Sequence, residues 1–408
     1  MFRNVSFLVF GTFLSQLILF STTPILSRFF SPEDFGLYGV VMSLAALISG
    51  VSTCKYELAL VKLKKNKISM TTTLLMSMSF CFIFVLCVLF YYVDFIPEWN
   101  KELFIFFREN IFNMFFLLCG VSFFNILTYT LHANNNVGSV ASSMVLRAVF
   151  QALLPLTFMY YFLLPDSLIL GALLSYLLSS ILMLFYFKGA LLKIPNLKWC
   201  SYFINKNIDF PKFTLPHFLL DKSRDVLLLF GVSAFYGIEV GGAITVAQRL
   251  LSAPTQILSK SLTIFVFKHF NTEKKTKNIF LLYLKVVAIF SLLALGMFLI
   301  FSLLSENFIY YLLGEQWVPY SELIVAISIW YFSVFVGSIF SQLPFVYNKN
   351  KEFFYCNVAF FILFGCSFFL GPYLKDYVFL YLISSMNFIF ILLFLIWMGF
   401  LVYRGRYD

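Results

Sequence analysis

The chain has 408 residues, of which 61% are hydrophobic and only 12% are charged, and its formal net charge is +10. An ordinary soluble domain carries about 25% charged residues, so this composition excludes a soluble globular protein. The seven cysteines and three histidines are scattered without a CxxC pair. We therefore interpret the cysteines as packing residues and predict neither a disulfide framework nor a metal site.

Apolar runs long enough to cross a bilayer, about 17 to 25 residues each, recur along the whole chain. They predict an all-α polytopic membrane protein with about twelve transmembrane helices. In chain order the predicted spans are 5–27, 35–54, 69–93, 111–131, 138–163, 167–187, 213–235, 238–267, 278–304, 321–346, 353–373 and 377–402.

Lysine and arginine gather on alternate connections between these spans. They cluster in residues 55–67, 188–212 and 268–277, whereas the intervening connections are mainly acidic. By the positive-inside rule the basic connections and both termini face the cytoplasm. The positive net charge thus indicates topology. Because the lysines are divided among separate connections, we do not expect a nucleic-acid-binding surface.

The longest of the inner connections, residues 188–212, divides the chain into two halves of six spans. We expect an N-terminal lobe of residues 1–187 and a C-terminal lobe of residues 213–408 around a central cavity, as in transporters built from two repeats. Aligning the halves so that Gly36 pairs with Gly241 places Gln16 on Asp221. Each lobe would then carry a polar residue in the middle of its first helix.

The segment FLLDKSRDVLLLF places four charged residues inside the seventh predicted span. Each would cost about 2.5 to 3.5 kcal/mol at the centre of a lipid-facing helix, so the cluster must face protein or water. At helical spacing His217, Asp221 and Asp225 share one face, and Arg224 can reach Asp221 from i+3. One interpretation is a self-neutralising cluster that fixes the helix. We favour a polar cavity lining, in which Lys222 and Arg224 bind substrate and His217, Asp221 and Asp225 are candidates for ion coupling.

The eighth predicted span carries a polar stripe at steps of three and four residues. From Thr245 to Thr263 the stripe rises about 27 Å, nearly the thickness of the hydrocarbon core. Contact between helices through small polar residues would explain its serines and threonines but not its two cations. A water-facing wall is therefore favoured. Its members are Thr245, Gln248, Arg249, Ser252, Thr255, Gln256, Ser259, Lys260 and Thr263.

Weaker polar strips mark two other spans. Residues Ser139 to Gln151 place Arg147 in the fifth span, and the first span carries Gln16 with Arg28 near its outer end. Lys55 and Glu57 follow the second span, where a pair at i, i+2 does not stack on a helix. We interpret those two as boundary residues.

The basic residues expected in the interior outnumber the acidic ones, which predicts a cationic cavity. Positive charge at low dielectric attracts anions, and arginine suits diphosphate because its planar fork makes paired hydrogen bonds. The cargo should therefore be anionic and phosphorylated. The basic set is Arg28, Arg147, Lys222, Arg224, Arg249 and Lys260, and the polar lining is Gln16, Gln248, Ser252 and Gln256.

The sequence carries no motif of an enzyme: neither a glycine-rich phosphate loop nor a histidine-rich cluster is present. The predicted outer connections are also short for a polymerase or glycosyltransferase, so we predict no catalytic residue and no covalent chemistry. A membrane-embedded polysaccharide polymerase or ligase and a multidrug antiporter remain as alternatives.

Two segments carry a family resemblance. The segment LSRFFSPEDFGLYGVVMSLAALISG with the CKYELALV that follows, and LLGEQWVPYSELIVAISIWYF with SQLPFVYNKNKEF, resemble Wzx-type oligosaccharide flippases. These belong to the multidrug/oligosaccharidyl-lipid/polysaccharide (MOP) exporter superfamily. Gly36, Gly314 and Trp317 match the pattern of the family; we interpret Gly36 as a helix-start residue and Trp317 as an interfacial anchor.

The resemblance implies a function and a cellular setting. It implies a MATE-like pair of six-helix lobes that moves an undecaprenyl-diphosphate-linked oligosaccharide from the cytoplasmic to the periplasmic leaflet. The setting would be the bacterial inner membrane, during assembly of O-antigen or another surface polysaccharide. The expected partners are membrane lipids and the polymerase and chain-length proteins of the same pathway. No cofactor is expected, with H⁺ or Na⁺ as the candidate coupling ion.

Overall fold

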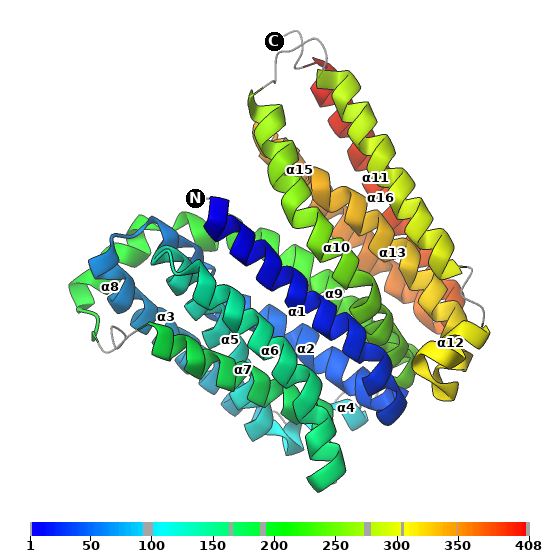
Figure 1. Ribbon diagram of the computed structural model, residues 1–408, viewed down its shortest axis with the longest axis horizontal. Coiled ribbons are helices and arrows are strands. Elements are labelled where there is room, and N and C mark those ends of the chain that lie inside the picture. Colours follow the sequence, from blue (N-terminus) through cyan, green and yellow to red (C-terminus); the bar gives the residue numbers. More distant parts are fainter. Residues whose placement is uncertain are drawn as a thin grey trace. The chain divides into compact units, whose positions relative to one another are not determined.

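The computed structural model describes residues 2–92, 101–162, 166–187, 193–272, 279–302, 306–347 and 349–404. Among these residues every regular element is helical (Figure 1). The predicted all-α fold is therefore confirmed. The α-helices are α1 Phe2–Phe29, α2 Pro32–Ser52, α3 Lys65–Tyr92, α4 Lys101–Glu109, α5 Ile111–Ala133, α6 Val137–Thr157, α7 Ser167–Tyr186, α8 Leu197–Lys206, α9 Leu215–Tyr236, α10 Ile238–Thr272, α11 Ile279–Ser302, α12 Glu306–Leu313, α13 Ser321–Phe340, α14 Leu343–Val346, α15 Asn350–Ser367 and α16 Asp376–Arg404.

Short tight or wide helical turns join several of these helices. They are η1 Tyr56–Lys62, η3 Phe158–Phe162, η5 Phe210–Thr214, η6 Glu315–Tyr320 and η7 Phe368–Tyr373. Each predicted span overlaps one long helix, and the span 321–346 contains both α13 and α14. The span ends at residues 93, 163, 278 and 304 lie outside the described residues. The short helices α4, α8 and α12 lie in connections for which the sequence predicted no element.

Ten helical segments within the described residues are long and apolar enough to cross a membrane. The predicted seventh and eighth spans are not among them, although α9 and α10 form at those positions. The four charged residues of α9 lower the mean hydropathy of that helix, whereas in α10 the side chains of residues 256–262 lie outside the described residues. Both helices are nevertheless long enough to span, since 22 residues of α9 rise about 33 Å.

The start of α2 is encoded by the segment SPED. The Ser31 amide and hydroxyl both donate to the Asp34 carboxylate at 2.8 Å, and the Asp34 amide donates back to the Ser31 hydroxyl at 3.2 Å. This reciprocal pairing satisfies amides that the first helical turn leaves without a partner. Pro32 occupies the first helical position, where its missing N–H costs nothing.

The chain forms two compact units. The first contains residues 1–22 and 37–230, and the second contains residues 23–36 and 231–408. The chain passes between them inside α1, α2 and α9, next to Pro24, Gly36 and Gly231. The division predicted from the sequence, with lobes at residues 1–187 and 213–408, stays a prediction.

Helices α3, α5, α6 and α7 pack against one another within the first unit. Small residues allow their backbones to approach, as is usual for helices in membranes. A Cβ atom on Gly171 of α7 would lie 2.5 Å from the ring of Pro155 in α6. The Ser180 hydroxyl donates to the Gly120 carbonyl of α5 at 3.3 Å. This bundle supports the polar side chains of α2 and α6.

In the second unit α13 is the central helix and packs against α10, α11 and α16. The Asn387 amide of α16 donates to the Ser333 hydroxyl of α13 at 2.7 Å, and both residues are buried. The first turns of α2 and α10 also meet in this unit. There a Cβ atom on Gly36 would lie 2.0 Å from the Ile238 carbonyl oxygen, and one on Gly242 would lie 1.9 Å from that of Pro32.

Candidate functional site

Arg147 of α6 lies in an aromatic and amide setting inside the first unit. Its Nη1 atom donates to Gln151 Oε1 at 2.8 Å and to the Tyr176 hydroxyl at 3.3 Å. The guanidinium also lies 4.9 Å from the centroid of the Tyr176 ring and 5.5 Å from that of Phe124. Gln151 in turn donates to the hydroxyl of buried Tyr38.

No carboxylate neutralises this arginine in the described part of the chain, where none of the ion pairs includes Arg147. Its positive charge is held by ring faces and neutral acceptors, which stabilise a cation without cancelling its field. A half-buried arginine in this state retains its attraction for an anion. The predicted role of Arg147 in binding substrate stays a prediction.

The charged cluster of α9 forms two ion pairs. Arg224 Nη2 lies 3.0 Å from Asp221 Oδ1, as the helical spacing predicted, and this contact is confirmed. Lys222 Nζ lies 2.8 Å from Asp225 Oδ2, a pair that the sequence analysis did not anticipate. His217 is partly buried one turn before Asp221. The self-neutralising arrangement is therefore present, while the roles in ion coupling and substrate binding stay predictions.

The polar stripe of α10 is partly inside the protein. Thr245 and Thr255 are buried, and their hydroxyls donate to the carbonyls of Gly241 and Ser252 in the same helix. The side chains of Gln248, Arg249 and Ser252 are partly buried. The Arg249 guanidinium lies 5.4 Å from the centroid of the Phe35 ring. The side chains of Gln256 and Lys260 lie outside the described residues, so the predicted water-facing wall stays a prediction.

Two side chains in the last turn of α1 form hydrogen bonds to backbone carbonyls at the end of α12. Arg28 donates to the Tyr311 carbonyl at 2.5 Å, and the Ser27 hydroxyl donates to that of Leu313 at 3.0 Å. These bonds satisfy carbonyls that the end of a helix leaves open. Arg28 is exposed and Gln16 is partly buried. The observed contact of Arg28 is therefore a structural one. Its predicted role in binding substrate stays a prediction.

The interpretation of Trp317 as an interfacial anchor was wrong. Its side chain is 0% exposed, its indole nitrogen donates to the Ser27 carbonyl at 2.7 Å, and its ring meets Phe35 edge to face. A tryptophan of a membrane interface would be open to lipid head groups. Here the ring packs inside the protein and joins η6 to the chain around Ser27.

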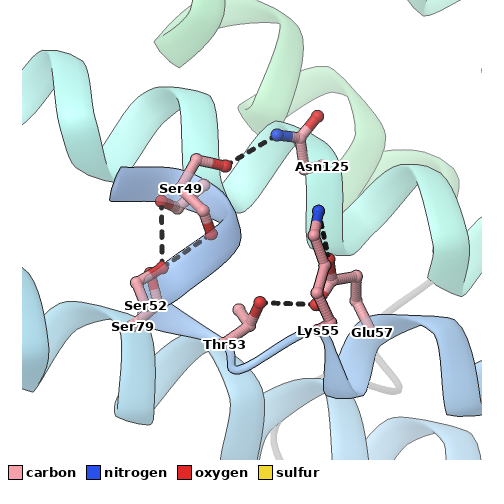
Figure 2. A network of polar contacts seen from close by, with 8 residues as sticks. Ser49, Ser52, Thr53, Lys55, Glu57, Ser79 and Asn125 are labelled. Atoms are coloured by element: carbon pink, nitrogen blue, oxygen red, sulfur yellow. Dashed lines mark hydrogen bonds and ion pairs between the residues drawn. The ribbon is translucent and has the colours of Figure 1, made fainter. Parts of the chain in front are cut away.

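A polar network that the sequence analysis did not propose lies at the end of α2 (Figure 2). Glu57 is almost fully buried, accepts a hydrogen bond from the Thr53 hydroxyl and lies 3.4 Å from Lys55 Nζ. Beside it the Asn125 amide donates to the Ser49 hydroxyl at 2.7 Å. The serines of α2, α3 and α5 continue the network, through Ser52, Ser79 and Ser122.

The backbone that follows α2 is strained. Cys54 and Lys55 have φ values of 49° and 61°, in the left-handed region. This conformation costs about 1 to 2 kcal/mol for each residue other than glycine, and strain of this kind is common at functional sites. The left-handed turn reverses the chain into η1, which brings the Glu57 carboxylate back toward Lys55.

Lys55 therefore lies in an unusual setting for a lysine. Burial lowers the pKa of its ammonium group, Glu57 opposes that shift, and Lys222 adds to the lowering. Its Nζ atom also lies 3.5 Å from the centroid of the Phe218 ring of α9. Helical spacing alone indicates only boundary residues at Lys55 and Glu57, because a pair at i, i+2 does not stack on a helix. The signal was present in the polar residues of GVSTCKYE, which end the apolar run of α2.

Within the described residues no group of three or more histidine, cysteine, aspartate or glutamate side chains could hold a metal ion. The charged side chains that could contact a charged ligand are those of Arg147, Arg249, Lys55 and the two ion pairs of α9.

Comparison with known proteins identifies the family and the fold of the chain. A family model described as polysaccharide biosynthesis protein matches residues 25–322. No curated protein sequence matches the chain. Among solved structures, the lipid II flippase MurJ in an inward closed conformation is similar, with a TM-score of 0.74 and 14% identity over 96% of this chain and 86% of that chain.

Two further structures show the same likeness. An inward-facing multidrug resistance MATE family transporter of the MOP superfamily gives a TM-score of 0.70 at 14% identity, covering 98% of this chain and 94% of that chain. A MOP superfamily transporter from Pyrococcus furiosus gives 0.56 at 14% identity, covering 99% and 96%. The chain thus has the fold of the MOP superfamily. Because the family match spans more than half of its length, the chain belongs to the polysaccharide biosynthesis protein family.

Proposed function

We propose that this protein is a Wzx-type flippase that moves an undecaprenyl-diphosphate-linked oligosaccharide from the cytoplasmic to the periplasmic leaflet of a bacterial inner membrane. The product would feed O-antigen or another surface polysaccharide. The family membership, the MOP fold and the resemblance of two segments to Wzx-type flippases support this proposal. They favour transport over a membrane-embedded polymerase or ligase.

The observation that carries the proposal is Arg147. An arginine inside a membrane-crossing segment is costly to insert and is retained where it binds or conducts something. This one is held by Gln151 and Tyr176, with no ion pair to a carboxylate among the described residues. Such a cation suits an anionic head group, whereas a cavity for cationic drugs would favour acidic residues.

The mechanism is alternating access. The sugar and diphosphate would enter a cationic cavity while the polyprenyl chain stays in lipid, and the two lobes would then expose the head group on the other side. Arg147, Arg249 and Lys260 would hold the diphosphate or acidic sugars. Their attraction has to be moderate, because a head group bound too tightly would not be released.

A coupling ion would make the cycle directional. We assign H⁺ or Na⁺ to Asp221 and Asp225, with His217 beside them, because these groups lie on one face of α9. Both termini would lie in the cytoplasm, and the polymerase and chain-length proteins of the pathway would receive the product.

Leaflet transfer in reconstituted vesicles tests this proposal. Purified protein is inserted into liposomes that contain an undecaprenyl-diphosphate oligosaccharide, and a membrane-impermeant glycosidase reports the fraction in the outer leaflet. The wild-type protein should accelerate transfer, and Arg249→Glu and Lys260→Glu should each lower the rate at least about tenfold. Arg404→Glu serves as the control, because Arg404 is an exposed residue in the last turn of α16.

Each alternative result contradicts part of the proposal. If Arg249→Glu and Lys260→Glu insert normally and transfer the glycan at the wild-type rate, the assignment of a cationic cavity is wrong. A change in glycan chain length without leaflet transfer would favour the polymerase or ligase. Efflux of a cationic drug without transfer of the lipid-linked glycan would favour an antiporter.

A further inference from the structure

The ammonium group of Lys55 is held by an unusually loose ion pair. Its Nζ atom lies 3.4 Å from Glu57 Oε1, whereas the Lys222–Asp225 pair of the same unit measures 2.8 Å. Charge-assisted hydrogen bonds are normally about 2.7 to 2.9 Å long. The second neighbour of the ammonium is the Phe218 ring, which attracts a cation but accepts no strong hydrogen bond. Lys55 thus keeps the capacity to bind a stronger anion.

Close packing sets the position of this ammonium group. A Cβ atom on Gly50 would lie 2.2 Å from the Phe218 ring and 3.0 Å from Lys55 Nζ, so a larger residue would displace the ring or the ammonium group. The left-handed turn at Cys54 and Lys55 then directs the lysine side chain to this place. The position of the Lys55 ammonium group is thus fixed by Gly50, the left-handed turn and the Phe218 ring.

A second lysine acts on Lys55 through its charge. Phe218 and Lys222 are one turn apart and share a face of α9. The charge of Lys222 is close enough to lower the pKa of Lys55. Each lysine has a carboxylate partner, Glu57 or Asp225, so an incoming anion would exchange partners with them. The C-terminal end of α2 favours cations and gives an anion no help, so the two lysines must supply the attraction.

We propose that Lys55 and Lys222 form a phosphate subsite for the head group of the cargo, and that Glu57 competes with the phosphate for Lys55. This inference rests on the proposed function, since it assigns the diphosphate of a lipid-linked glycan to these residues. A diphosphate carries more negative charge than either carboxylate and can contact both ammonium groups. When it leaves, the lysine returns to Glu57, whose buried carboxylate would otherwise lack its cation.

The competing explanation is a structural ion pair that only closes the turn between α2 and η1. The neighbouring hydrogen bonds from Asn125 to Ser49 and between Ser52 and Ser79 do not involve Lys55. Neutralising the pair should therefore leave the rest of the network in place. This allows the two explanations to be separated by binding.

The test measures binding of farnesyl diphosphate to the full-length protein in detergent by isothermal titration calorimetry. Lys55→Gln should weaken binding at least about tenfold, and Glu57→Gln should tighten it several-fold because the competitor is gone. The control Lys64→Gln removes an exposed lysine beyond the end of η1 and should leave the affinity unchanged. Farnesol and inorganic pyrophosphate, measured in parallel, separate the contributions of tail and head.

Equal affinities in wild type and Lys55→Gln would overturn the subsite, and so would equal affinities for farnesol and farnesyl diphosphate. If Glu57→Gln weakens binding, Glu57 is not a competitor. If Lys55→Gln does not fold, the neutral double variant Lys55→Gln/Glu57→Gln takes its place with the same expectation. In vesicles, a wild-type protein that transfers no glycan would contradict the proposed function itself. Equal transfer rates for wild type and Lys55→Gln would contradict only the subsite.

Discussion

A single arginine illustrates how this protein keeps charge inside a membrane helix. Arg147 has two neutral hydrogen-bond acceptors and two ring faces around its guanidinium. These groups offset part of the cost of removing the cation from water without pairing it to a carboxylate. The α9 cluster uses the other solution, in which each cation has an acidic partner three residues away.

The difference predicts how Arg147 responds to a conservative change. Arg147→Lys keeps the charge but loses the planar fork and the stacking on Tyr176, so we expect transfer in vesicles to fall about tenfold while expression stays normal. The measurement is the initial rate of leaflet transfer at equal protein incorporation. A lysine variant as fast as wild type would mean that charge alone suffices and that the described geometry has no role.

Local spacing predicted some of these contacts and missed others for a physical reason. The Arg224–Asp221 pair follows from helix geometry, because i and i+3 side chains meet on any helix. The Lys55–Glu57 pair depends on two left-handed residues, and its surroundings come from Gly50, Phe218 and Asn125. No pattern along one helix contains that information. The error at Trp317 has the same origin, since composition does not show whether a ring meets lipid or protein.

At the scale of elements, the helices were predictable and their short connections were not. Long apolar runs specify spans because only a helix satisfies its own backbone in lipid. The short helices α4, α8 and α12 are amphipathic and only eight to ten residues long, so apolar runs of spanning length do not reveal them. The contact of α2 with α10 is a tertiary feature, made by two glycines that lie far apart in the chain.

That contact predicts an unequal response to two glycine substitutions. Gly36→Ala would place a Cβ atom 2.0 Å from the Ile238 carbonyl oxygen, so backbone has to shift and the protein should lose folded yield or several degrees of Tm. Gly138→Ala, in the first turn of α6 with open space around it, should be neutral or stabilising by at most about 1 kcal/mol. Thermal unfolding in detergent compares the two, and equal Tm values would show that α2 and α10 do not touch as described.

At the scale of the whole molecule, the fold was predictable to the level of the superfamily. Twelve spans, alternating basic connections and two family-like segments led to the MOP fold that the structural likeness shows. Charge chemistry predicts an anionic, phosphorylated cargo, whereas the proposal of a lipid-linked oligosaccharide comes from the family resemblance. The chain passes between its compact units at Pro24, Gly36 and Gly231, residues that tolerate or impose unusual backbone geometry. Such positions fit the alternating access that we propose.

The central claim is that embedded cations select a negatively charged head group for transfer between leaflets. The most direct measurement compares two cargoes in the same vesicles: one oligosaccharide joined to a polyprenyl chain by a diphosphate, and the same oligosaccharide joined by an uncharged ether. We expect the diphosphate-linked glycan to be transferred at least about tenfold faster. Equal rates for the two cargoes, with both accelerated over protein-free vesicles, would contradict the claim.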